Sequence, residues 1–299
     1  MKTLIKIVLL ICFQTNLFAQ PYFRVVLSNM VKHSTDKWAT PGSKLNKNHI
    51  VQVKPKGILM MEYSEGGTVY ISKTGTYEVA MLEEKLRVLK KTAGKNAVIY
   101  DIHRDANQRL LPIRRYFRQV RGAIAGRNHN PNSIKLMVNN EGSKYYHPEI
   151  TIRWVTRFAK QVHQVVFTNE FEEPVYIQET KDTSIILNLE KQKLTSKALL
   201  LIINLKVNAN QKSYKHLITN IKVDKRYKSF KKEYETFQKQ KTNKKTKAFN
   251  KLEEAYLFEK YACYFDTLKC LERAVKLSDG QEAYVLAYRL FVTSYFSGY

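Results

Sequence analysis

The chain has 299 residues, with 51 Lys or Arg against 26 Asp or Glu, so its formal net charge is +25. An apolar fraction of 44% with 12% aromatic residues excludes general disorder. The length suits two or three domains, each small enough to need its own hydrophobic core.

Residues 1–19 have the pattern of a secretory signal peptide. Two lysines flank the start of the short apolar run Ile7–Phe13, and a small residue, Ala19, precedes the expected cleavage site. The run is too short to cross a bilayer, which disfavours the alternative of an N-terminal membrane anchor. We expect a mature protein that begins at Gln20, lacks a transmembrane span, and is periplasmic or associated with the outer membrane.

What the net positive charge implies about binding partners depends on the location of the protein, which is expected to be exported. The expected partners are then envelope proteins with acidic surfaces, anionic glycans, lipopolysaccharide or anionic lipid headgroups. Nucleic acid is the usual partner of basic cytoplasmic proteins and is not the main expectation here. The alternative is a solvated basic surface that only keeps the protein soluble.

Residues 20–80 are predicted to form a small all-β domain. Short runs rich in β-branched and aromatic residues are separated by glycine and proline turns at intervals of about ten residues. Such spacing is typical of a small β-meander or barrel. The expected strands include Ile50–Val53, Ile58–Tyr63, Thr68–Ser72 and Thr76–Val79.

The same segment resembles the FecR-type periplasmic β-domain. The resemblance rests on Pro41–Leu45, His49–Val53, the glycine hairpin Gly66–Ile71, and Gly75–Val79. It implies a fold and a location in the envelope. The best-known members regulate sigma factors from a membrane-anchored form, a role not expected here because no anchor or cytoplasmic tail is recognised.

Residues 81–130 are expected to form a helical connector. Leu82, Leu86 and Leu89 recur at helical spacing, and a second helix is expected over Asn96–Asp105.

A third connector helix is expected to begin at Pro112, because proline suits the first turn of a helix. Its outer face is rich in arginine, which either binds phosphate or forms a solvated basic side. These candidate partner-binding residues are Arg114, Arg115, Arg118 and Arg121.

Residues 131–210 return to the alternation of short strands and are predicted to form an antiparallel β-sandwich. The segment resembles an immunoglobulin-like domain, and the lack of the antibody disulfide cysteines favours the fibronectin type III variant. Trp154 is expected between the two sheets, the alternative being a sugar-stacking surface. The expected strands are Ile134–Val138, Glu149–Trp154, Val162–Phe167, Val175–Ile177, Ser184–Leu189 and Ala198–Val207.

Residues 211–299 are predicted to be helical, with a basic helix followed by a helical hairpin unit. Tyr227, Phe230, Tyr234 and Phe237 fall on one helical face, which is more typical of a core face than of a base-stacking surface. Lysines crowd the rest of this helix, and four are candidate partner-binding residues: Lys228, Lys231, Lys232 and Lys239.

From about Leu252 onward the chain resembles one tetratricopeptide-like helix pair with a capping helix. Two positions depart from the pattern, since Thr267 replaces a small alanine and Asp279 stands where proline is expected. A single such unit cannot bury its own face, so it must pack on the sandwich, on the basic helix or on another protein. The matching positions are Ala255, Phe258, Tyr264, Leu271, Ala274 and Leu277.

The sequence contains no recognisable catalytic constellation. It has no GxSxG elbow, HExxH pair, Walker loop or dinucleotide fingerprint, and no cysteine–histidine pattern that suggests zinc. We therefore expect no enzymatic activity, cofactor or metal. Cys263 and Cys270 lie near a turn, either as two buried thiols or as a disulfide.

The sequence thus predicts a multidomain protein of all-β modules plus α-helical parts. The first functional hypothesis is a non-enzymatic envelope scaffold or accessory subunit that mediates protein–protein interaction. The alternative is a polyanion-binding module for lipopolysaccharide, acidic glycan or extracellular DNA. Salt dependence separates the two, because polyanion binding weakens steeply with ionic strength.

Overall fold

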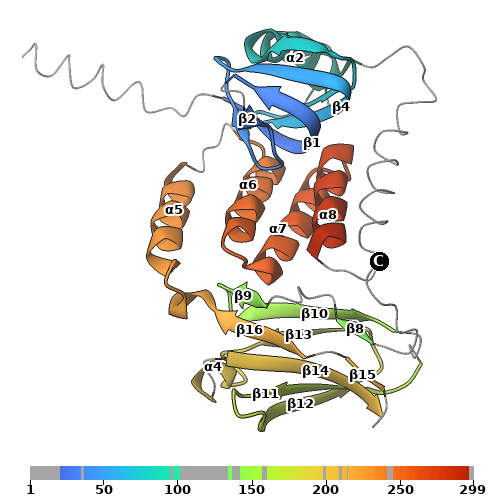
Figure 1. The fold of residues 1–299 in the computed structure, drawn as a ribbon, viewed down its shortest axis with the longest axis vertical. Coiled ribbons are helices and arrows are strands. Elements are labelled where there is room, and N and C mark those ends of the chain that lie inside the picture. Colours follow the sequence, from blue (N-terminus) through green and yellow to red (C-terminus); the bar gives the residue numbers. More distant parts are fainter. Residues whose placement is uncertain are drawn as a thin grey trace, which may run out of the picture. The chain divides into compact units, whose positions relative to one another are not determined.

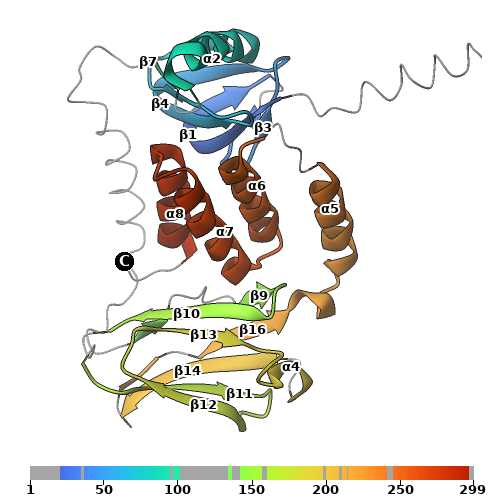
Figure 2. The same ribbon diagram turned by 180° about the vertical axis from the view of Figure 1, so that it is seen from behind.

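The structure is a computed structural model of the chain, drawn in Figures 1 and 2. The chain divides into two compact units, residues 1–102 with 238–246, and residues 103–237 with 247–299. The expected signal peptide and the four candidate arginines at positions 114, 115, 118 and 121 lie outside the described residues. The structure describes residues 21–34, 37–94, 97–101, 134–136, 142–156, 160–197, 200–208, 211–213, 215–240 and 245–295.

The first unit is built on a seven-stranded sheet. Two long antiparallel strands, β1 (Phe23–His33) and β4 (Ile50–Tyr63), form its centre. The strand order is β2-β1-β4-β5-β7, with β3 paired to β1 and β6 paired to β4. The shorter strands are β2 (Lys37–Trp38), β3 (Lys44–Leu45), β5 (Thr68–Ile71), β6 (Gly75–Glu78) and β7 (Val98–Asp101).

Helix α2 (Val79–Ala93) covers one face of this sheet (Figure 1). Leu82 and Leu86 join the sheet residues in one hydrophobic core. The hairpin between β4 and β5 approaches the helix closely at Gly67, which has a φ of +114°. A Cβ at this position would lie 3.0 Å from Leu86 Cδ1, so both the backbone conformation and the available space require glycine.

Strand β7 corrects the expectation of a helix over Asn96–Asp105. Residues Val98–Asp101 pair in parallel with β5, where Val69 stands opposite Ile99. The open edge of β5 and the β-branched residues of this segment favour a strand over the local helical pattern. The first β-unit therefore continues past residue 80 and includes α2. Within the described residues, β2 and β7 do not pair, so no barrel closes.

The second unit contains two sheets, which lie as separate layers (Figure 2). One has the order β13-β10-β8, and the other has the order β12-β11-β14-β16-β9 with β15 paired to β14. The strands are β8 (Lys135–Leu136), β9 (Ser143–Tyr145), β10 (Glu149–Val155), β11 (His163–Thr168), β12 (Pro174–Thr180), β13 (Ser184–Asn188), β14 (Leu200–Asn208), β15 (Gln211–Lys212) and β16 (His216–Asn220), and a short helix, α4 (Leu194–Lys197), precedes β14.

One hydrophobic core joins these two sheets. Ile152 and Trp154 from β10 belong to the same buried cluster as Phe167 from β11 and Ile203 from β14. Trp154 is only 3% exposed, which confirms its predicted core position. Its ring lies edge-on to that of His163, with 5.5 Å between the centroids.

The larger sheet differs from the expected sandwich in two ways. Strand β16 extends the sheet into the segment expected to be helical from residue 211, because His216–Asn220 pairs with β14. Strand β9 pairs with β16 in parallel, with Ser143 opposite Ile218, so the sheet is not wholly antiparallel. Both strands are too short for their period-two pattern to stand out in a lysine-rich sequence.

The described C-terminal part is helical after β16. A 3₁₀ turn, η4 (Ile221–Val223), leads into α5 (Tyr227–Gln240), which is followed by α6 (Lys247–Lys260), α7 (Tyr264–Leu277) and α8 (Glu282–Tyr295). Helices α6, α7 and α8 lie side by side (Figures 1 and 2). The chain is therefore a mixed α/β protein with sheets first and helices last.

Candidate functional site

The aromatic face of α5 packs against neighbouring elements, with Phe230 buried and the other three aromatic residues half-buried. Phe230 is fully buried, and its ring centroid lies 5.0 Å from that of Tyr146, 5.3 Å from Tyr261 and 5.9 Å from Phe258. Tilted and edge-on aromatic pairs of this kind contribute more stability than the burial of their apolar surface alone would give. The expectation that the stripe is a core face is confirmed at Phe230.

Polar contacts fix the same helix against α6. Glu233 accepts hydrogen bonds from Lys260 Nζ at 2.7 Å and from the Tyr261 hydroxyl at 3.0 Å. Desolvation by itself would raise the pKa of Glu233, but these two hydrogen bonds outweigh it and hold the pKa below its ordinary value. Tyr234 donates a further hydrogen bond to Glu254 Oε1 at 3.2 Å. Helix α5 is therefore a fixed support for its outer side chains.

The four predicted lysines all lie on the exposed side of α5. Lys231 has one acidic neighbour, Glu235 Oε1 at 4.0 Å, and such exposed pairs contribute little energy. Lys228, Lys232 and Lys239 form no ion pair with any residue that the structure describes. Lys239 lies in the last turn, in the part of the helix assigned to the first unit. The outer face of α5 thus presents positive charge with little local neutralisation.

Helix α7 is anchored to the sandwich through Asp266 in its first turn. The carboxylate accepts the backbone N–H of Tyr146 at 2.7 Å and that of His147 at 3.1 Å. It also contacts His147 Nδ1 at 2.6 Å and is itself buried. Hydrogen bonds to a buried carboxylate are among the stronger ones in proteins, so this residue fixes the turn before β10 onto α7.

Two further kinds of contact join α7 to the sheets. Phe265 belongs to the hydrophobic core between the two sheets. Lys269 Nζ lies 2.6 Å from Glu149 Oε1 at the start of β10, and Glu272 pairs with Arg153 farther along the same strand. Helix α7 therefore packs on the sandwich, one of the three outcomes expected for the hairpin unit.

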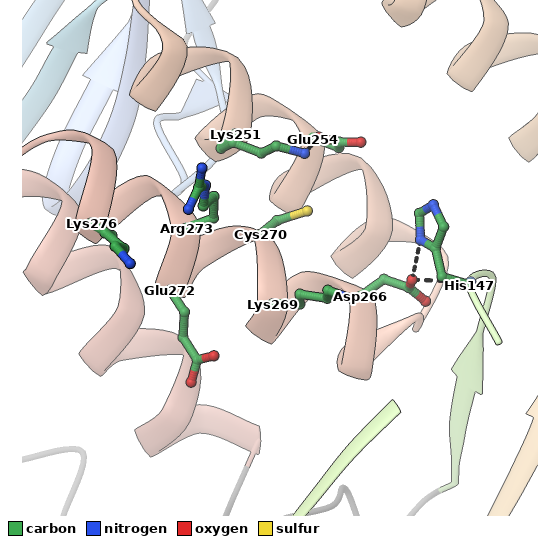
Figure 3. Close-up of a pocket in the computed structure, with 9 residues that line it drawn as sticks. All are labelled: His147, Lys251, Glu254, Asp266, Lys269, Cys270, Glu272, Arg273 and Lys276. Carbon is green, nitrogen blue, oxygen red and sulfur yellow. Dashed lines mark hydrogen bonds and ion pairs between the residues drawn. The ribbon is translucent and has the colours of Figure 1, made fainter. Parts of the chain in front are cut away.

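A pocket of about 490 Å³ opens beside α6 and α7 (Figure 3). Figure 3 shows His147 reaching Asp266 from the turn before β10, while the other lining side chains come from the two helices. Its lining is mostly charged and consists of His147, Lys251, Glu254, Asp266, Lys269, Cys270, Glu272, Arg273 and Lys276.

The pocket contains a thiol, an imidazole and a carboxylate, the residue types of a cysteine hydrolase. Activation of a thiol requires a lowered pKa, whereas burial raises the pKa of Cys270 far above its ordinary value. No hydrogen bond joins Cys270 to His147 within the described part of the chain, and Figure 3 shows the two side chains apart. Cys263 is likewise a buried free thiol, as the first of the two alternatives predicts.

Most charges of the pocket are already paired. Lys251 Nζ lies 2.5 Å from the buried Glu254 Oε2, and this hydrogen bond raises the pKa of Lys251 although desolvation opposes it. Arg273 and Lys276 take part in no ion pair with the described residues. The remaining free charge of the pocket is therefore positive.

The structure places the predicted lysines on one exposed helix but adds residues that sequence reasoning missed. His147, Asp266, Arg273 and Lys276 come together only through the docking of α7 on the turn before β10. Asp266 and His147 are 119 positions apart, and no local motif marks either residue.

Comparisons of the chain with protein-family models, with curated proteins and with solved structures found no match. Among the described residues, no helix is both long and apolar enough to cross a membrane. The same residues include no group of three or more His, Cys, Asp or Glu side chains suited to a metal ion.

Proposed function

We propose that this chain is an exported, non-enzymatic scaffold or accessory subunit of the cell envelope. Its partner-binding surface is the lysine-rich outer face of α5, and its partner is an envelope protein with an acidic surface. The signal-peptide pattern of residues 1–19 supports the location. The single observation that carries the proposal is that α5 packs its aromatic side inward, with Phe230 buried, while its lysines stay exposed.

The local packing supports a recognition role for this helix. Phe230 and Glu233 fix α5 on α6, so Lys228 and Lys232 are displayed from a preorganised backbone. Preorganised charges lower the entropic cost of binding and steer encounter with an oppositely charged partner. Residues 20–80 resemble the FecR-type periplasmic β-domain, residues 131–210 resemble an immunoglobulin-like domain, and the hairpin unit resembles a tetratricopeptide-like helix pair.

The pocket chemistry favours binding over catalysis. Cys270 is a thiol whose pKa is raised, and Asp266 is engaged by the turn before β10. Arg273 and Lys276 line the pocket and provide a second positively charged position that could bind a carboxylate of the partner.

Charge reversal on α5 tests the proposal. The variant K228E/K231E/K232E/K239E should fold normally but retrieve less partner from envelope extracts, because exposed charges affect encounter more than stability. The matched control is K47E/K73E/K85E/K181E, which reverses four exposed lysines elsewhere. Equal retrieval by the wild type and by the α5 variant would contradict the proposal.

A polyanion-binding module is the second candidate function, favoured by the lack of ion pairs at Lys228, Lys232 and Lys239 among the described residues. Binding of lipopolysaccharide, acidic glycan or DNA should fall steeply between low and moderate salt. Salt also weakens a contact between α5 and an acidic protein surface, because exposed charges are screened. Direct binding of purified lipopolysaccharide or DNA in the absence of any protein partner therefore distinguishes the two functions.

A further inference from the structure

The first unit gathers three cations around the ring of Tyr22. From the ring centroid, Lys44 Nζ lies at 4.7 Å, Lys245 Nζ at 4.9 Å and Arg24 Cζ at 5.8 Å. Lys245 also donates a hydrogen bond to the Tyr22 hydroxyl at 2.9 Å. All four residues belong to the same compact unit, although Lys245 lies far from the others in sequence.

The strand register brings like charges together. Arg24 stands directly opposite Lys44 in the β1–β3 pair, and like charges in this position destabilise a sheet. On the other side of Arg24, β4 places Glu62, a buried carboxylate that accepts a hydrogen bond from Thr68 Oγ1 at 2.7 Å. Three cations thus converge on one ring, and Glu62 stands across the sheet from one of them, Arg24.

Burial and mutual repulsion weaken the charged forms of both lysines. The pKa of Lys44 is lowered to about 8 by burial, by Arg24 and by Lys245. The pKa of Lys245 is also lowered to about 8, by burial and by Arg24. Burial raises the pKa of Tyr22 to about 12, so its hydroxyl stays neutral and adds no negative charge. A nearby anion would favour the protonated lysines again.

The cluster is open at one side. Lys44 is exposed as a residue, whereas Tyr22 and Arg24 are each 8% exposed. A hydrogen bond from Arg24 Nη1 to the Gly42 carbonyl holds the guanidinium beneath the ring. An anion from solvent therefore meets Lys44 first and has buried positive charge behind it.

We propose that Arg24, Lys44 and Lys245 form a binding site for a phosphate-type oxyanion, supplied as free phosphate or as the phosphomonoester of a lipid headgroup. A tetrahedral group with two negative charges suits several converging cations better than a single carboxylate does. The site shares no residue with the basic face of α5 and does not depend on the proposed function.

Isothermal titration with inorganic phosphate at constant ionic strength tests the site in the full chain. We expect one saturable site in the wild type and at least tenfold weaker binding in K44Q/K245Q. The control K47Q/K85Q removes the same charge from exposed positions of the same unit and should bind like the wild type. The proposal is overturned if the wild type shows no saturable site, or if both double variants lose binding equally.

A second readout needs no variant. In carbon-13 NMR of labelled lysines, two side chains should titrate near pH 8 and move to higher pH when phosphate is added. An unchanged titration would overturn the proposal.

Vesicle flotation then separates the two sources of the phosphoryl group. Retention on phosphatidylcholine vesicles that contain phosphatidic acid, lost in K44Q/K245Q and kept in K47Q/K85Q, identifies a lipid headgroup. Phosphate binding without such retention identifies free phosphate.

Discussion

The Asp266 carboxylate and the His147 imidazole lie 2.6 Å apart, although 119 positions separate them in sequence. The same carboxylate accepts the backbone N–H groups of His147 and Tyr146. Asp266 itself is buried, and it joins the start of α7 to the turn before β10 alongside Phe265 and the ion pair of Lys269 with Glu149. The pocket and the position of α5 both depend on that docking.

Replacement of Asp266 by Asn should lower the free energy of unfolding by about 1–3 kcal/mol, since Asn keeps only one of the two oxygens that accept the backbone N–H groups of Tyr146 and His147. The measurement is urea unfolding followed by the fluorescence of Trp154. It is made in a W38F background, because Trp38 is the other tryptophan of the chain. D279N is the matched control: Asp279 is exposed and has a φ of 55°, which Asn tolerates. Equal unfolding midpoints in D266N and D279N would show that Asp266 does not anchor α7.

Trp154 should emit as a buried indole. Trp38 is 53% exposed, whereas Trp154 is 3% exposed, so the W38F variant should have a blue-shifted spectrum compared with the wild type. Trp154→Ala should cost about 3–5 kcal/mol, because the cavity between the sheets cannot collapse fully. A spectrum of W38F that matches a solvated indole would refute the core assignment.

Acid should destabilise the second unit through His163. Neither ring nitrogen of this buried side chain has a hydrogen-bond partner of ordinary geometry in the described part of the chain. Burial lowers the pKa of His163, and the Thr180 backbone offsets this only in part. The unfolded chain therefore takes up a proton first as the pH falls through about 6.5, and stability decreases from there down to the folded pKa.

The loss attributable to His163 should reach at most about 1.4 kcal/mol per pH unit. Urea unfolding of W38F at about pH 7.5 and about pH 5.5 measures it. W38F/H163F keeps a ring beside Trp154 and should lose less stability on acidification. If both proteins lose the same amount, other groups cause the acid effect.

Sequence patterns predicted the helices and strands in which apolar residues recur at a regular spacing. The alternation around Trp154 predicted a buried strand, and the spacing of Tyr227 and Phe230 predicted a helix with one packed face. The short strands β7 and β16 were missed because each depends on the edge of a neighbouring strand more than on its own residues.

The candidate sites were predictable only in part. Exposed lysines on α5 follow from helical spacing, since the packed aromatic face fixes the opposite side. The pocket could not be predicted, because Asp266 and His147 meet only after α7 docks. The cluster around Tyr22 likewise requires Lys245, which is 223 positions away and has no sequence signal that links it to Tyr22.

Site-specific photo-crosslinking in cells tests the central claim that α5 is the partner-binding surface. A benzoylphenylalanine probe is placed singly at Lys228 and at Lys232, with Phe171 as the control position because it is 76% exposed in the same unit. If α5 is the partner-binding surface, both α5 positions should give the same discrete protein adduct and position 171 should give none. No adduct from α5, or an identical adduct from the control position, would contradict it.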